Sequence, residues 1–137
     1  MIISAPEKID ILKVGCIIIH NNKYLLVHRK KDNKWCNVHG IFEDEDKSIN
    51  LAIKKKVSEE IDILIEPMFF KVIYLKINDE NIAYYLFKYI FNYDLSNKII
   101  LGKEYDKFGF YSFEEALKLD LYEDEDYILK LNDENRT

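Results

Sequence analysis

The chain has few glycines, prolines and cysteines, and it has no long apolar run. Four Gly and two Pro in 137 residues leave no low-complexity linker, which predicts one domain over residues 1–137. Cys16 and Cys36 are the only cysteines, which excludes a disulfide framework and a C-x-x-C zinc pair and predicts two small buried side chains. The longest apolar run near the start, residues 16–19, is too short for a signal core or a spanning helix. We therefore expect a cytoplasmic protein without a membrane partner.

An excess of positive charge is also missing. Twenty-five acidic residues against 20 basic ones give a net charge of −5, which argues against strong binding to nucleic acid or anionic membranes. A few local cations could still hold a phosphate ligand. Aromatic residues are plentiful at 14%, led by ten Tyr and eight Phe, so large rings should dominate the core.

The hydrophobic pattern predicts strands, then one helix, then further strands and helices. A β-branched run predicts a strand over 13–20 that is buried on both faces, and Asn21-Asn22 predicts a tight turn into a second strand over 23–30. Apolar residues at helical spacing predict a helix over 48–61, with Asp46 or Ser48 as N-cap and Asp62 at its end.

The second half of the chain predicts two long strands followed by short helices. The expected elements are strands at 69–77 and 82–93 around a turn at 78–81, a loop at 102–109, a helix opened by the Ser112–Glu115 capping box and running to about 119, and a helix at 123–131. Residues 1–7 are expected to be a loose N-terminus and 132–137 a frayed tail. This order predicts the α+β class, a mixed β-sheet flanked by helices.

Alternating aromatic residues mark one face of the strand expected at 82–93. A base-stacking wall and a sheet face packed under a helix both fit this pattern, and the packed face is the commoner outcome. The residues concerned are Tyr85, Phe87, Tyr89, Phe91 and Tyr93.

A charged segment in the middle of the chain carries the strongest functional signal. It begins His39-Gly40-Ile41-Phe42-Glu43, continues through an acidic run to Asp46, and reaches Lys55-Lys56-Val57-Ser58-Glu59-Glu60 on the predicted helix. This resembles the Nudix box, usually written G-x5-E-x7-R-E-U-x-E-E-x-G-U with U aliphatic. The likeness extends over about 13–117, including Trp35 and the downstream capped helix. It implies a Nudix-like α/β/α sandwich.

The resemblance also implies a chemistry. Nudix domains bind Mg²⁺ or Mn²⁺ through the glutamates of the box, and water attacks phosphorus in a nucleoside diphosphate linked to another group. Acids at i, i+3 and i+4 project from nearly one helix face, so three carboxylates can converge on a hard cation. Such a cation neutralises the phosphates and activates water.

Four departures from the box pattern bear on that chemistry. His39 and Asp62 replace glycines, one residue is inserted within 43–47, and Lys56 replaces the first glutamate of the helix. An ammonium group has only donors and cannot ligate Mg²⁺. Our hypothesis is that Lys56 occupies the space of the missing metal and pairs with Glu59 and Glu60.

The resemblance assigns roles to the remaining residues of the segment. It makes Glu43, Glu59 and Glu60 metal ligands, and Glu59, Glu60 and Glu104 catalytic. The alternative for Glu43 is an acidic surface loop, because the string Glu-Asp-Glu-Asp recurs at 123–126.

Substrate contacts are expected at the strand end and at the box turn. Arg29, one of two arginines, resembles a phosphate-binding residue, and His39 and Gly40 lie at the turn. His20, His28 and His39 have no metal-ligand spacing and are expected to be structural.

Two functions stay open on the sequence alone. One is a divergent hydrolase of nucleoside-diphosphate-linked compounds that uses Mg²⁺ or Mn²⁺ and is weakened by Lys56. The other is an inactive Nudix-fold module that binds a nucleotide or a protein and needs no metal. A homodimer is compatible with either.

Overall fold

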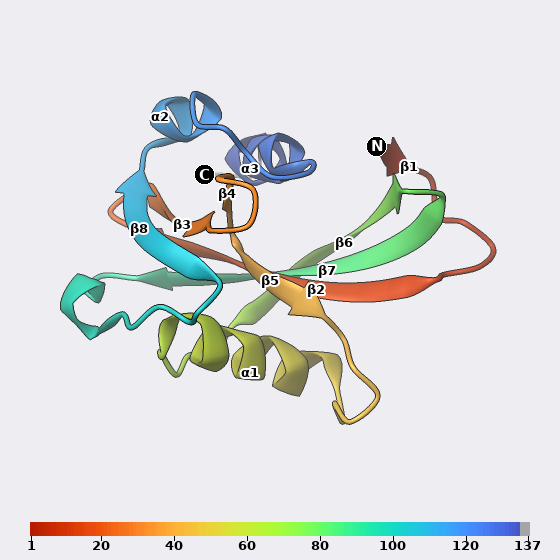
Figure 1. Ribbon diagram of the computed structural model, residues 1–137, viewed down its shortest axis with the longest axis horizontal. Helices are drawn as coiled ribbons and strands as arrows, with labels where there is room; N and C mark the ends of the chain where they lie inside the picture. The colour runs from red at the N-terminus through yellow and green to blue at the C-terminus, as the bar shows by residue number, and fades with distance from the viewer. Residues whose placement is uncertain (135–137) are drawn as a thin grey trace.

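The computed structural model describes residues 1–134, and it shows a curved sheet with α1 on one side and α2 and α3 on the other (Figure 1). This arrangement confirms the expected mixed sheet flanked by helices. No helix within these residues is long and apolar enough to cross a membrane. The elements are β1 (Ile2–Ile3), β2 (Ile11–His20), β3 (Lys23–Arg29), β4 (Trp35–Cys36), β5 (Val38–Ile41), α1 (Ile49–Ile61), β6 (Met68–Ile77), β7 (Glu80–Phe91), a 3-10 turn (Ser96–Lys98), β8 (Tyr105–Tyr111), α2 (Phe113–Leu117) and α3 (Glu125–Glu134).

The sheet divides into two halves at β2 and β3. Its main order is β1-β6-β7-β2-β3-β4, β5 also pairs with β2, and β8 also pairs with β3. Strands β2 and β7 are parallel, and the other pairs are antiparallel. Cys36 pairs with Val27 on β3, whereas Val38 pairs with Cys16 on β2. Asn37 therefore lies where the chain passes from one half of the sheet to the other.

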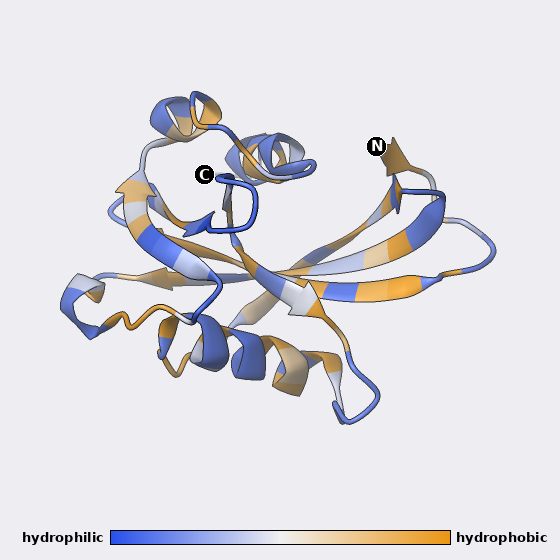
Figure 2. Ribbon diagram, viewed as in Figure 1, coloured by the Kyte–Doolittle hydropathy of each residue, from blue (hydrophilic) through white to orange (hydrophobic). Residues whose placement is uncertain are grey.

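Two apolar layers hold the helices against the sheet. Val14, Cys16 and Ile18 face α1, whereas Ile17 on the same strand faces the opposite layer with Leu129 of α3. This alternation follows from the two-residue period of a strand and explains why residues 14–19 lack polar side chains on either face. Figure 2 shows hydrophobic residues concentrated on the central strands and hydrophilic ones along much of the loop between β5 and α1.

Local signals placed the turns and the central helix correctly. Asn21 and Asn22 adopt φ of 51° and 60° at the β2–β3 turn. The Ser48 hydroxyl accepts a hydrogen bond from the Leu51 amide, and Asp62 ends α1 in a left-handed conformation at φ 60°. The Ser112–Glu115 capping box is present, but its helix ends at Leu117.

The aromatic face of β7 is packed, as expected, rather than open for stacking. Phe87 and Phe91 are buried in the layer under α1, and Tyr85 and Tyr89 pack against that layer. Tyr93 lies beyond the end of β7, which stops at Phe91, and its side chain is exposed.

Three expectations about irregular segments were wrong, each because of a distant partner. The expected loop at 102–109 contains the start of β8, which pairs with β3. Ile2 and Ile3, in the N-terminus expected to be loose, pair with Leu75 and Tyr74 of β6.

The C-terminal tail was the third such segment. Helix α3 continues to Glu134 because buried Asn132 donates a hydrogen bond to the Tyr24 hydroxyl at 2.7 Å. Residues 135–137 of the predicted frayed tail lie outside the described part of the chain.

Candidate functional site

A cleft of about 420 Å³ lies where the two halves of the sheet separate. Seven predicted site residues line it together: Arg29, His39, Gly40, Glu43, Lys56, Glu60 and Glu104. Apolar side chains, including Ile11, Ile41 and Ile82, complete the lining. The split sheet and α1 therefore bring strand-end, turn and helix residues into one space.

Lys56 extends across the wall of this cleft. Its side chain is 13% exposed, and its Nζ lies 3.4 Å from Glu43 Oε1. The aliphatic part lies against Gly40, where an added Cβ would come within 2.6 Å of Cδ and Cε. The absence of a side chain at position 40 therefore lets the lysine lie along the wall.

The predicted partners of Lys56 were wrong. In residues 1–134, the carboxylate within ion-pair distance of its ammonium group is Glu43, and neither Glu59 nor Glu60 reaches it. Glu59 is turned outward, where Lys55 Nζ lies 3.9 Å from its Oε1. Spacing along the helix alone could not show this, because both acids have other neighbours to turn toward.

Glu60 is the inward-facing member of the acid pair. It is half-buried, the Tyr105 hydroxyl hydrogen-bonds to it, and its buried Oε2 has no hydrogen-bond partner in the described residues. Burial raises the pKa of Glu60 to about 7, with a smaller contribution from the charge of Glu104. Glu60 is therefore a carboxyl group that changes charge near neutral pH.

Glu59 borders a smaller adjoining pocket of about 160 Å³, which Lys56, Glu60 and Glu104 also line. Glu43 lines the cleft and Glu59 the smaller pocket, whereas Glu60 and the ammonium group of Lys56 border both. As placed, these acids do not fit the convergent carboxylate set that the box pattern implies for a divalent cation.

A cationic and aromatic wall lies opposite α1. The Arg29 guanidinium lies over the Tyr122 ring at 3.9 Å from its centroid, and Arg29 Nε donates to Asp32 Oδ1 at 3.0 Å. Lys13 Nζ lies 5.1 Å from the centre of the Tyr84 ring and 5.6 Å from that of Tyr122. Arg29 and Lys13 therefore place two basic groups in the same lining as the acids.

His39 forms the floor between these walls. Its ring stacks on Tyr122 at a centroid distance of 5.5 Å, and its Nδ1 lies 2.9 Å from the Asn37 carbonyl oxygen. Burial lowers the pKa of His39 to about 3, so the imidazole is neutral at physiological pH.

The other two histidines have structural contacts, as expected. The His20 ring stacks on the Phe91 ring, and His28 Nδ1 is hydrogen-bonded to Asp106 Oδ1 at 2.7 Å.

Sequence reasoning missed four residues of this region: Lys13, Tyr105, Tyr122 and Glu125. One signal was available for Lys13, a charged residue at the start of an apolar strand. The other three come from segments far from the box. The repeated acidic string at 123–126 is the local signal that includes Glu125, and it predicts a helix start rather than a site.

The fold has clear counterparts among solved structures. The NUDIX domain of Shewanella oneidensis NrtR, complexed with ADP ribose, matches with a TM-score of 0.81 and 14% identity over 95% of this chain and 90% of that one. The MutT protein from Methanosarcina mazei Go1 matches with a TM-score of 0.76 and 19% identity over 97% and 100%. This chain has the Nudix fold. No family model and no curated protein matches the sequence significantly.

A third counterpart was solved with ligands. The bifunctional NMN adenylyltransferase/ADP ribose pyrophosphatase of Francisella tularensis, complexed with AMP and a Mn ion, matches with a TM-score of 0.76 and 20% identity over 96% of this chain and 43% of that one. At such identities the similarity to Nudix structures concerns the backbone arrangement. The chemistry of this cleft depends on its own side chains.

Proposed function

We propose that this protein is a divergent Nudix-type hydrolase of nucleoside-diphosphate-linked compounds, and that Lys56 weakens its turnover. One observation carries the proposal: the acids Glu60 and Glu104 and the basic residues Arg29 and Lys13 line a single cleft on a Nudix fold. Cations can hold a diphosphate while a carboxylate of the same cleft acts on water.

The cationic wall supports binding of the phosphates. Arg29 presents a guanidinium held flat by Tyr122, and such a group can donate two parallel hydrogen bonds to phosphate oxygens. Lys13 adds positive charge on the same side, and Lys56 adds it from α1. The apolar side chains of the cleft offer a surface for the uncharged part of the ligand.

Glu60 is the residue best suited to take a proton from water. A general base works best with a pKa near the working pH, and burial raises the pKa of Glu60 to about 7. The Tyr105 hydroxyl is a hydrogen-bond partner of this carboxyl group. We therefore expect any turnover to require Glu60 in its ionised form.

A divalent cation would need a different arrangement of the same wall. Glu43, Glu60 and Glu104 are the oxygen donors that could hold Mg²⁺ or Mn²⁺, which would supply charge neutralisation and water activation. The ammonium group of Lys56 first has to leave Glu43. This competition is the physical reason for expecting weak turnover.

The Lys56–Glu43 ion pair also favours a second function, a nucleotide-binding module without turnover. In that case Lys56 supplies to the bound phosphates the positive charge that a metal would otherwise supply. Ligand binding would then need no divalent cation, and replacing Glu60 would change affinity but no reaction rate.

The test is a panel of dinucleotides, nucleoside triphosphates and ADP ribose incubated with the full chain, with and without Mg²⁺ or Mn²⁺. Products are separated by chromatography, and binding of a nonhydrolysable diphosphate analogue is measured by calorimetry. We expect slow cleavage that Glu60→Gln abolishes and the matched variant Glu59→Gln retains. Binding without cleavage would establish the second function. The absence of both binding and cleavage would refute both functions.

A further inference from the structure

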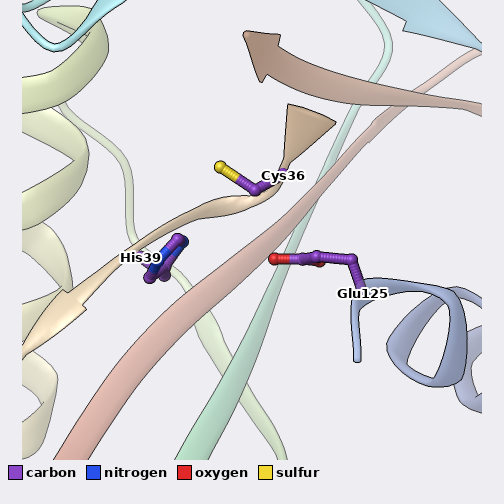
Figure 3. Close-up of side chains that lie close together, drawn as sticks. All are labelled: Cys36, His39 and Glu125. Carbon is purple, nitrogen blue, oxygen red and sulfur yellow. The ribbon is translucent and has the colours of Figure 1, made fainter. Parts of the chain in front are cut away.

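A second group of polar side chains lies behind the cleft and plays no part in the proposed hydrolysis. One ligand-type atom each of Cys36, His39 and Glu125 lies within 4.8 Å of the other two. Figure 3 shows the Glu125 carboxylate extending from the start of α3 toward the segment in which β4 carries Cys36 and β5 carries His39. Their exposed fractions are 0% for Cys36, 8% for His39 and 1% for Glu125.

We propose that Cys36, His39 and Glu125 form a binding site for a borderline transition-metal cation, with Zn²⁺ as the best match. A thiolate, an imidazole and a carboxylate are the three ligand types that Zn²⁺ accepts in proteins. Mg²⁺, by contrast, selects oxygen ligands and disfavours sulfur. The site is therefore chemically distinct from the acids on α1.

Asn37 already orients two of the ligands. Because a carbonyl oxygen only accepts, the contact from His39 Nδ1 to the Asn37 carbonyl means that Nδ1 carries the hydrogen and Nε2 presents its lone pair. The Asn37 amide and side-chain nitrogens donate to the two Glu125 oxygens at 3.3 and 2.8 Å. Outer partners of this kind commonly fix the direction of metal ligands.

Unsatisfied polar atoms around the group point to a missing ligand. Asn37 Oδ1 and the Tyr84 hydroxyl are buried and have no hydrogen-bond partner among residues 1–134. The Tyr84 ring lies 6.4 Å from the His39 ring, centroid to centroid. Buried polar atoms in folded proteins are nearly always paired. A cation with a bound water would supply partners for atoms of this kind.

The geometry leaves one coordination position free. Ligand atoms around tetrahedral Zn²⁺ are about 3.5–4 Å apart, so the three side chains must move inward by about 1 Å from the present arrangement. His39 borders both the site and the cleft, which gives the ion a route of entry and places the fourth position near the cleft.

Charge balance also permits binding. Cys36 must lose its thiol proton to solvent, and Glu125 its carboxyl proton where it holds one, and the cation then offsets both negative charges. Lys13 is a nearby positive charge that interacts with both Cys36 and Glu125, so their ionised forms would also offset it.

Co²⁺ is the spectroscopic probe for this site, and the full chain is titrated after treatment with a chelator. A thiolate ligand gives a near-ultraviolet charge-transfer band, and Zn²⁺ affinity is measured by competition with a chromophoric chelator. We expect one ion per chain, a band lost in Cys36→Ser, and Zn²⁺ affinity at least about 100-fold weaker in that variant. Cys16→Ser is the matched control, because Cys16 is equally buried and lies outside the group.

Glu125→Gln keeps the size of the side chain and tests the site independently of Cys36. It should weaken Zn²⁺ binding while circular dichroism shows a folded protein. A wild-type chain without the cobalt band, or a band that survives in Cys36→Ser, would overturn the proposal. Glu60→Gln and an excess of Mg²⁺ should leave the band unchanged, so failure of the hydrolase proposal would not affect this result.

Discussion

Two polar regions lie side by side in this molecule and differ in their access to water. The box wall, made of Gly40, Glu43, Lys56 and Glu60, borders the open cleft, and there Lys56 and Glu43 form an ion pair. The buried cluster, made of Cys36, Asn37, His39 and Glu125, is almost dry.

Burial shifts the pKa of His39 to about 3 and that of Glu125 to about 7, so both favour their neutral forms. In the box wall, exposed Glu43 has a lowered pKa because of hydrogen bonds with Glu45 and Lys56, whereas Glu60 shares the raised pKa of Glu125 because desolvation penalises the charged form of both.

The largest expected effect is on the pH dependence of stability through the buried cluster. Burial raises the pKa of Glu125 from 4.5 to about 7. The folded state then binds a proton that the unfolded state releases, so this carboxyl lowers stability as pH rises from about 4.5 to about 7. Between pH 5 and pH 8 we expect wild type to lose on the order of 3 kcal/mol from this group, and Glu125→Gln to lose none of it.

Urea denaturation of both proteins at the two pH values, with chelator present, measures this difference. Glu123→Gln is the control, because that neighbour is exposed. If the free energy of unfolding changed with pH in parallel for wild type and Glu125→Gln, the cluster would be more accessible to water than its burial indicates.

The next prediction changes the box wall. Lys56→Glu replaces the ammonium group by a carboxylate beside Glu43 and Glu60, which recreates a set of oxygen ligands. We expect Mg²⁺ affinity to rise by about 100-fold, measured by calorimetry. Lys55→Glu should have little effect, because Lys55 is exposed and turned toward Asp46 and Glu59. Equal affinities in wild type and Lys56→Glu would mean that the match to the box is drawn in the wrong register.

Two glycines differ in whether the neighbouring side chain can move aside. A Cβ at Gly15 would come within 2.6 Å of Cε1 in the buried ring of Tyr84. We expect Gly15→Ala to lower the free energy of unfolding by about 2 kcal/mol, because that ring cannot move aside. A Cβ at Gly40 meets the flexible end of Lys56, so Gly40→Ala should cost less than about 1 kcal/mol. Thermal and urea unfolding of both variants test this order, and an equal loss would contradict it.

The smallest effect is expected on the outer face of α1. Glu59 is half exposed, and its contact with Lys55 is at 3.9 Å. Exposed pairs of this kind contribute little, so Glu59→Gln should change the free energy of unfolding by less than about 0.5 kcal/mol. A larger loss in urea denaturation would show that Glu59 takes part in the cleft more than its outward direction indicates.

Several elements of the fold could be predicted from local signals in the sequence. Asn21-Asn22 marks a turn, Ser48 and Asp62 bound a helix, and the box residues fall on that helix in the order that the Nudix resemblance requires. Each of these features depends on backbone preference or on side-chain period over a few residues.

The contact partners of the site residues, in contrast, depend on how distant segments pack. The ion pair between Lys56 and Glu43 depends on the position of the loop before α1. The pairing of β8 with β3 depends on a strand about 80 residues earlier. Glu125 reaches Asn37 across 88 residues of sequence. No local pattern encodes such contacts, because burial and electrostatic environment arise only when distant segments pack together.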